Sequence, residues 1–264
     1  MGEDMAIPGL QARRWLVLVI AVPAAFVVTG VVLTIMRTRP AKVAAARAGA
    51  PSKAREERPG PSRPAAARRT FAEPSSRAIQ LLPLIDPTFD GVVGEWRSVS
   101  GALMSPLVKG KPTSLLVPYI PPEEYDLILV VQRKVGEEAL HIGLASGDAQ
   151  FTVVIGAKWD RGYFSGLDLI DGKGFDRNES TALGEVFRPE HQSAVVCSVR
   201  RSGVTVEVDG TAVIRWEGSL NRLSRGSFFK FPHPQALCLG SWETAYLVSR
   251  MFVEPVTGTG KRLR

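Results

Sequence analysis

The sequence predicts an all-β domain of antiparallel strands, preceded by one transmembrane helix and a disordered linker. Three observations lead to this prediction. From about Leu81 onward, apolar and polar residues alternate in short runs that Gly, Pro and Asp separate. No long amphipathic helical pattern lies between those runs. Near the N-terminus, by contrast, the uncharged residues 15–36 form one continuous apolar run.

The apolar run predicts a retained membrane anchor that follows a short tail at 1–14. At about 1.5 Å per residue, a helix over residues 15–36 measures about 33 Å, enough to cross a hydrocarbon core of about 30 Å. The apolar region of a cleaved signal peptide is shorter, at about 7–15 residues. Arg13 and Arg14 give the segment only a faint similarity to a twin-arginine export signal. We therefore expect a single-pass protein of the cell membrane.

Two observations disagree on the side of the membrane that the large domain occupies. Basic residues are more frequent just after the helix than before it, and the positive-inside rule then places the domain in the cytoplasm. The type of domain, described below, favours the extracytoplasmic side. Because large domains can translocate despite their charge, the side stays open, with the extracytoplasmic side preferred.

Residues 37–77 predict a disordered linker. They hold eleven basic and three acidic residues, six prolines and almost no large apolar side chains, so they cannot build a core. The prolines favour extended conformations, which makes the linker a spacer. The linker balance of +8 exceeds the net charge of the whole chain, +7, so the rest is almost neutral. Without a cluster of Lys and Arg beside stacking aromatics, residues 78–256 give no sign of a nucleic-acid-binding domain.

Residues 78–256 predict one β-sandwich domain, followed by a C-terminal tail at 257–264. The expected strands are residues 98–104, 114–119, 125–133, 139–145, 150–156, 164–170, 193–201, 204–208, 211–216, 236–242 and 247–254. The clearest element is the hairpin around Asp209-Gly210, which suits a type I′ turn and places Val204, Val206 and Val208 on the core side. The polar segments 171–192 and 217–235 are expected as loops at the rims of the sandwich, where binding sites usually lie.

The cysteines and histidines indicate no metal site. Cys197 and Cys238 lie in apolar strand patterns, which suits buried free thiols at least as well as a disulfide. The histidines, His141, His191 and His233, are scattered along the chain and lack metal-ligand spacing. We expect structural roles for all three histidines.

The C-terminal strands resemble those of concanavalin-A-like and laminin-G-like jelly rolls. The resembling stretches are residues 193–200, the Val-Asp-Gly hairpin within 203–216, the Gly-Ser-Trp strand within 237–242, and 248–254. More narrowly, residues 80–256 are similar to bacterial domains near the 3-keto-disaccharide hydrolase family. The resemblance implies a jelly-roll sandwich with a recurrent use in carbohydrate binding, although such folds also serve as protein-binding and structural modules.

The resemblance does not supply a catalytic residue. Glycoside hydrolysis normally needs two carboxylates on either side of the scissile bond. Jelly rolls of the laminarinase type use a strand motif similar to Glu-x-Asp-x-x-Glu, of which Glu207 and Asp209 match the first two acids, whereas Ala212 takes the place of the third. Enzyme activity stays open, with binding favoured.

Five residues are candidates for ligand binding. Asp168, Asp171, Asn178 and Glu179 concentrate in one Gly-containing segment, whose oxygens suit a polar loop, a ligand contact or a Ca²⁺ ion. Trp159, in a turn, is the aromatic residue expected to be exposed and to stack on a sugar, whereas Trp216 and Trp242 are expected in the core. No metal ligand or cofactor is assigned.

The sequence thus leads to three functional hypotheses. The first is a membrane-anchored binding module for carbohydrate or another cell-surface component. The second is a glycoside hydrolase-like enzyme with acids from residues 168–179. The third is a structural or protein-partner domain on the cytoplasmic side, which the basic residues next to the membrane would suit.

Overall fold

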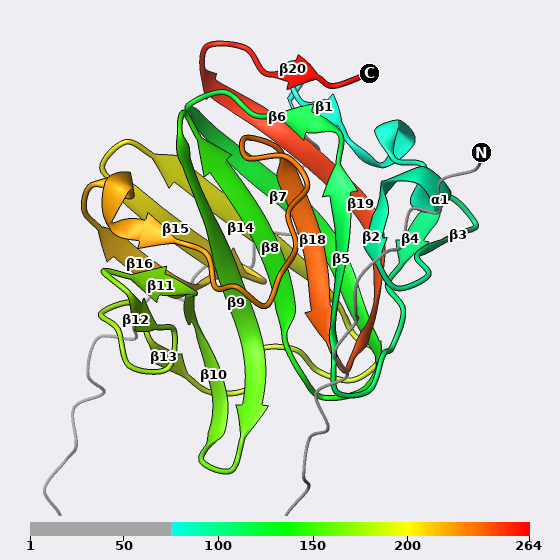
Figure 1. Cartoon of the computed structure of the whole chain (residues 1–264), viewed down its shortest axis with the longest axis vertical. Helices are drawn as coiled ribbons and strands as arrows, with labels where there is room; N and C mark the ends of the chain where they lie inside the picture. Colours follow the sequence, from blue (N-terminus) through cyan, green and yellow to red (C-terminus); the bar gives the residue numbers. More distant parts are fainter. Residues whose placement is uncertain (1–74) are drawn as a thin grey trace, which may run out of the picture. The chain divides into compact units, whose positions relative to one another are not determined.

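The computed structural model describes residues 75–264, and these fold mainly as two antiparallel β-sheets packed face to face (Figure 1). The predicted tail and transmembrane helix, and all but the last three residues of the predicted linker, lie outside the described residues. From residue 75 onward, no helix is long and apolar enough to cross a bilayer. The prediction of an all-β antiparallel sandwich is confirmed for the folded part.

The first sheet has eight strands, seven of which follow one another across the sheet, while the eighth, β1 (Ile79–Gln80), pairs with β19. The order is β16 (Thr211–Glu217), β15 (Gly203–Val208), β14 (Gln192–Arg200), β7 (Glu124–Val135), β19 (Ala245–Thr257), β4 (Ala102–Met104) and β3 (Arg97–Val99).

The second sheet has seven strands, in the order β13 (Ala182–Leu183), β10 (Gly162–Leu167), β9 (Ala149–Trp159), β8 (Leu140–Ser146), β18 (Leu237–Trp242), β5 (Pro112–Val117) and β2 (Gly91–Val93). Two small sheets join β12 (Lys173–Gly174), β11 (Leu169–Ile170) and β17 (Leu223–Ser224), and β20 (Lys261–Arg262) with β6 (Tyr119–Ile120). The short helices are η1 (Leu82–Leu84), α1 (Pro87–Asp90) and η2 (Leu220–Arg222).

All eleven predicted strands contain observed strands, but three were predicted as single strands and are divided. Residues 98–104 form β3 and β4, because Ser100 (φ 50°) and Gly101 (φ 81°) adopt left-handed conformations and turn the chain between them. Residues 114–119 and 164–170 are likewise shared between β5 and β6 and between β10 and β11. Alternation alone does not distinguish one strand from two that a tight turn or a break separates.

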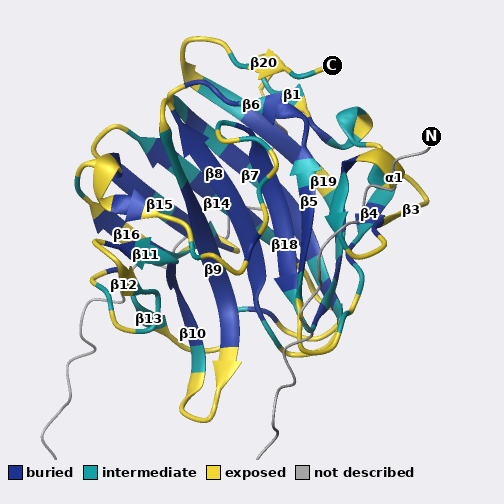
Figure 2. Cartoon of the chain, in the orientation of Figure 1, coloured by how far each residue is buried: buried dark blue, intermediate teal, exposed yellow. Residues whose placement is uncertain are grey.

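The core lies between the two large sheets. Because successive side chains of a strand point to opposite faces, the inner face of each sheet is built from alternate residues, such as Leu127 and Leu129 of β7 and Ile142 and Leu144 of β8. Figure 2 shows these strands as largely buried. The Tyr125 hydroxyl crosses this core and donates a hydrogen bond to the Ala145 carbonyl oxygen, at 3.0 Å. Buried apolar area and this bond hold the layers together.

The β15–β16 hairpin has the predicted geometry. Asp209 (φ 50°) and Gly210 (φ 77°) both have positive φ, as a type I′ turn requires, and Val208 pairs with Thr211. Val204 and Val206 are buried together with Val208. The Asp209 side chain also has a structural role in the turn, because its Oδ1 accepts the Ala194 N–H at 2.8 Å and connects the turn to β14.

The last residues of the chain pack on the sandwich. Within the segment predicted as a tail, 257–264, β20 pairs with β6, and the Arg264 guanidinium donates to Oδ1 of the buried Asp90 at 2.6 Å. Both cysteines are buried and free. Cys197 faces the core from β14, whereas Cys238 lies on the opposite, outer face of the seven-stranded sheet.

Candidate ligand-binding face

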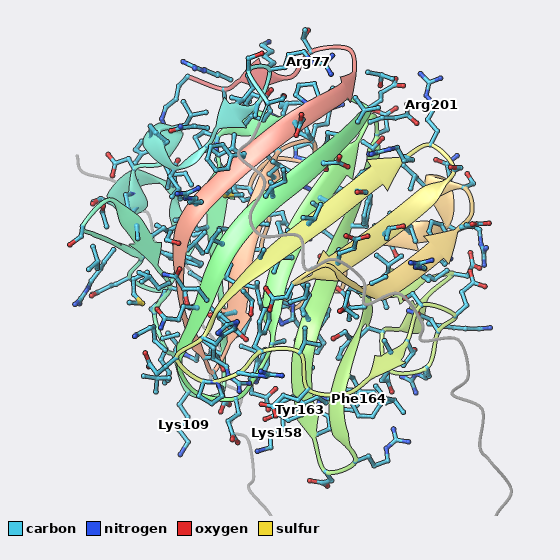
Figure 3. All side chains as sticks on the ribbon, turned by 180° about the vertical axis from the view of Figure 1, so that it is seen from behind. Arg77, Lys109, Lys158, Tyr163, Phe164 and Arg201 are labelled. Carbon is cyan, nitrogen blue, oxygen red and sulfur yellow. The ribbon has the colours of Figure 1, made fainter. Side chains whose placement is uncertain are left out.

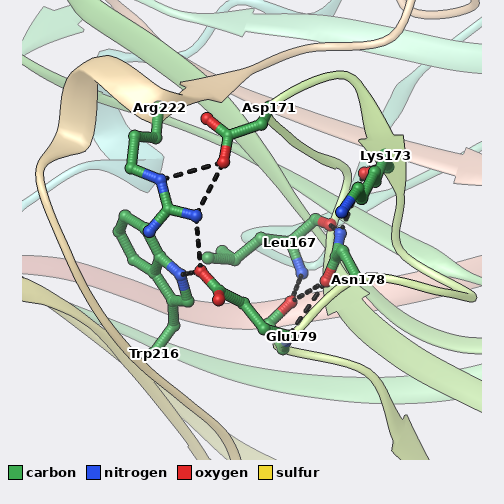
Figure 4. A network of polar contacts seen from close by, with 8 residues as sticks. Leu167, Asp171, Lys173, Asn178, Glu179, Trp216 and Arg222 are labelled. Atoms are coloured by element: carbon green, nitrogen blue, oxygen red, sulfur yellow. Dashed lines mark hydrogen bonds and ion pairs between the residues drawn. The ribbon is translucent and has the colours of Figure 1, made fainter.

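Two of the five candidate residues, Asp171 and Glu179, meet in one polar network (Figure 4). Arg222 donates to Oδ2 of Asp171 from Nε at 3.0 Å and from its terminal nitrogen at 2.6 Å, and the same terminal nitrogen lies 3.0 Å from Oε1 of Glu179. The Trp216 indole N–H donates to the same Glu179 oxygen at 2.6 Å. A guanidinium therefore lies between the two acids and offsets part of their negative charge.

Asn178 holds the loop beside this network. Its amide nitrogen donates to the carbonyl oxygens of Leu167, at 2.8 Å, and Lys173, at 3.1 Å. Its Oδ1 accepts from the backbone N–H and the hydroxyl of Ser180, at 3.0 and 2.7 Å. Both N–H donors and both acceptor lone pairs of this amide are used by neighbouring groups of the chain, so its role is structural.

The network does not favour Asp171 as the general acid of a glycosidase. A glycosidase acid must keep a proton near neutral pH, whereas the hydrogen bond from Arg222 lowers the pKa of Asp171 below its ordinary value. Among residues 75–264, no three His, Cys, Asp or Glu side chains are grouped so that they could hold a metal ion. The acids of this loop act on Arg222, and they fix the small sheet formed by β11, β12 and β17.

Trp159, the fifth candidate, is the last residue of β9. It is 42% exposed, as predicted, and its ring centroid is 5.3 Å from those of Phe164 and Phe175. In Figure 3 the side chains of Lys158, Tyr163 and Phe164 lie together at this end of the domain. Trp216 is buried, as predicted, whereas Trp242 is only half-buried. Trp159 thus touches the polar loop through the Phe175 ring, and none of the hydrogen bonds or ion pairs of the Arg222 network involves it.

Asp168 contacts the segment between β17 and β18 and not the Arg222 network. Its Oδ2 accepts the Gly226 N–H at 2.6 Å, and burial raises the pKa of this carboxyl above its ordinary value. Gly226 lies near the start of residues 225–236, the segment between β17 and β18 that we call the strap. Residues 217–235 were predicted as a rim loop, but the strap passes in front of β9 and β8 (Figure 1) and covers the outer face of the seven-stranded sheet.

Beneath the strap, three polar side chains share this outer face, which we call the covered face. Ser114 of β5 and His141 of β8 both pair with Gly240 of β18, one on each side, and Thr152 of β9 pairs with Gly143 of β8. Paired residues point to the same face of a sheet. Four buried atoms of this row have no hydrogen-bond partner within the described residues, namely Ser114 Oγ, His141 Nδ1 and Nε2, and Thr152 Oγ1.

Two phenyl rings of the strap close over this polar row. Phe229 stacks on His141 with a centroid separation of 3.9 Å. A Cβ atom at Gly240 would lie 3.2 Å from the Phe229 ring, and one at Gly143 only 2.5 Å from the Phe231 ring. The rings can approach the sheet because both strand positions are glycine. The covered face thus combines a flat backbone floor, a neutral polar row and an aromatic cover.

Burial keeps the His141 ring uncharged. Desolvation lowers the pKa of His141 to about 3, so near neutral pH its imidazole offers one N–H donor and one acceptor. Ser114 and Thr152 add hydroxyl groups that can donate and accept. None of the three was a candidate from sequence, since isolated Ser, Thr and His residues in strands carry no motif; the outward Gly143 and Gly240 were the available signal.

A hollow opens at the rim, beside the C-terminal end of the strap. Its volume is about 400 Å³, and its lining includes Glu123, Arg201, Gln235, Thr257 and Thr259. The Arg201 Nε donates to Glu123 at 3.0 Å across its edge. Figure 3 shows Arg201 at the end of the domain opposite Lys158.

Comparisons with known proteins give structural similarity only. No family model and no curated protein matches the sequence. Among solved structures, the chain is similar to carbohydrate-binding module CBM66 from Bacillus subtilis (TM-score 0.42, 12% identity, 62% of this chain and 94% of that chain). It is also similar to the Ca²⁺- and mannose-bound exoplasmic domain of VIP36 (0.45, 10%, 63% and 83%) and to the Crh5 transglycosylase (0.47, 14%, 69% and 85%). Similarities this low assign neither a ligand nor an activity to this chain.

Proposed function

We propose that this chain is a membrane-anchored carbohydrate-binding module with a jelly-roll domain, and that the covered face holds the sugar. One observation carries the proposal: Ser114, His141 and Thr152 direct four unpaired hydrogen-bonding atoms to one buried face, under two aromatic rings. Buried polar groups are nearly always hydrogen-bonded, so such a group calls for an explanation.

The chemistry of this row suits a neutral ligand rich in hydroxyl groups. An unpaired buried polar group costs roughly 1–3 kcal/mol, and sugar hydroxyls can both donate to and accept from imidazole and hydroxyl partners. The row contains no ionised side chain, because His141 is neutral. The apolar face of a pyranose would meet the glycine floor or the phenyl rings, a pairing that sugar sites commonly use.

Binding is favoured over hydrolysis at this face. Hydrolysis by the usual route needs two carboxylates about 5–10 Å apart. The polar row holds none, and Asp168, which reaches the strap beside it, is a single carboxyl group occupied by the Gly226 N–H. The predicted alternative, with acids from residues 168–179, has Asp171 and Glu179 joined through Arg222.

The proposal is tested with the full chain in lipid nanodiscs against a panel of glycans. For a glycan that binds, Ser114→Ala should raise Kd about tenfold, since the loss of one ligand hydrogen bond of about 1.4 kcal/mol corresponds to a factor of ten. Ser193→Ala is the matched control, because Ser193 Oγ is also buried and unpaired but faces the core from β14. Equal effects of the two variants, or no binding to any glycan, would refute the proposal.

We further propose that residues 15–36 span the membrane and that the domain lies on the extracytoplasmic side, since a surface glycan is found there. Residues 37–77 would then hold it away from the bilayer. An epitope tag after Arg264 allows protease digestion to be followed in intact, spheroplasted and lysed cells. We expect digestion of the domain before the inner membrane is breached. Survival until lysis would place it in the cytoplasm and favour a protein partner.

A further inference from the structure

We infer that the strap, residues 225–236, is a hinged lid that must leave the covered face before a ligand can enter. For its ligand, this inference rests on the proposed function. In the closed arrangement Ser114 and Thr152 are 1% and 0% exposed, and His141 is 7% exposed. A ligand the size of a sugar ring cannot reach these atoms unless the covering segment moves.

Side-chain hydrogen bonds attach the strap to the rest of the domain at its two ends. At the first end, Asp168 accepts the Gly226 N–H. At the second end, the Gln150 side-chain amide donates to the carbonyl oxygens of His233, at 2.8 Å, and Ala236, at 3.5 Å. The Gln235 amide adds a bond to the Gly147 carbonyl oxygen at 3.3 Å. These contacts define two hinges, and Gln235 also lines the rim hollow.

Between its two ends, the strap makes no hydrogen bond to the sheet among the described residues. Across residues 75–264, no backbone-to-backbone hydrogen bond is recorded for the strap, and the Arg225 guanidinium bonds within it, to the Phe229 carbonyl oxygen at 3.3 Å. The middle is held by ring packing: Phe229 and Phe231 lie on His141, Gly240 and Gly143, and Phe228 meets the Trp242 ring of β18 edge-on at 6.2 Å. Segments with few backbone hydrogen bonds open at a lower free energy than the paired strands beneath them.

The two free cysteines report on this opening from opposite faces of the sandwich. Cys238 is fully buried on the covered face, where it lies beside the position that Phe231 occupies above Gly143. Cys197 is equally buried, but in the core between the sheets. Burial raises the pKa of both thiols, so neither reacts readily in the closed state. Opening of the strap exposes Cys238 alone, whereas global unfolding exposes both.

The test is thiol alkylation of the full chain in nanodiscs, with each cysteine quantified by mass spectrometry. We expect Cys238 to react at least about tenfold faster than Cys197, because a local opening is more frequent than global unfolding. Asp168→Ala should raise the Cys238 rate several-fold and leave that of Cys197 unchanged. Gly226→Ala, whose Cβ would lie 2.9 Å from Asp168 Oδ2, breaks the same hinge by another route. Asp160→Ala, in the β9–β10 turn, is the control and should change neither rate.

Equal rates for the two thiols, in the wild type and in both hinge variants, would show that the strap opens only when the domain unfolds, and would overturn the lid. The failure of the lid and that of the proposed function are distinguishable. Faster labelling of Cys238 without any glycan binding would support the lid and refute carbohydrate as the ligand. Glycan binding with Cys238 as protected as Cys197 would support carbohydrate as the ligand and refute the lid.

Discussion

At the residue scale, neighbouring residues of β5 show what the covered face does differently from the core. Thr113 Oγ1 accepts the Ser241 N–H at 3.1 Å and lies 2.8 Å from the Ser241 hydroxyl, whereas the next residue, Ser114, points to the other face with its hydroxyl unpaired. At these two positions the core-facing hydroxyl is paired and the covered one is not. Of the six buried side-chain atoms without a partner among residues 75–264, four lie on the covered face, whereas Ser193 Oγ faces the core. Unpaired groups lower stability, so their concentration on one face suits a site whose partner comes from outside.

His141 should make stability depend on pH. Its pKa in the folded chain is about 3, below the ordinary 6.5, so the unfolded chain takes up this proton at higher pH than the folded chain does. The contribution of His141 to the free energy of unfolding is therefore complete above about pH 6.5. It is lost as pH falls toward 3, by at most about 1.4 kcal/mol per pH unit. Urea unfolding of wild type and His141→Gln from pH 7 to 4.5 checks this. As pH falls, the free energy of unfolding of the wild type should decrease relative to that of His141→Gln. A constant difference between the two free energies would contradict a neutral buried ring.

The sequence identified the polar loop but not its purpose. Asp171, Asn178 and Glu179 stand out because acids and Asn gather there, yet the residue that pairs with both acids, Arg222, is 51 positions beyond Asp171. Nothing in local spacing connects them. Ser114, His141 and Thr152 could not be selected at all, because their common property is a shared face that depends on the order of the strands.

At the element scale, the strands and the β15–β16 hairpin were predictable because they rest on local rules, namely alternation and the positive φ of Asp209 and Gly210. The strap was predicted as a loop, but its path across the sheet was not. Outward glycines in two strands, Gly143 and Gly240, indicate that another segment approaches closely. Their meaning becomes clear only once β8 and β18 are known to be neighbours.

At the scale of the whole molecule, charge and function are separated along the chain. The predicted linker holds a surplus of positive charge larger than that of the whole chain, +8 against +7, and residues 78–264 are nearly neutral. A neutral domain suits a neutral ligand, because it gains nothing from long-range attraction and must recognise its partner by contact. In the proposed function, recognition therefore depends on the polar row beneath the strap.

The most direct test of that claim is the glycan Kd of Thr152→Val, measured with the full chain in nanodiscs beside Thr113→Val. Thr152→Val removes an unpaired hydroxyl, so we expect Kd to rise about tenfold while the free energy of unfolding increases by about 1 kcal/mol. Thr113→Val removes a paired hydroxyl, so unfolding should become easier by about 1–3 kcal/mol with Kd unchanged. If Thr152→Val bound the glycan as tightly as wild type, the covered face would not be the site.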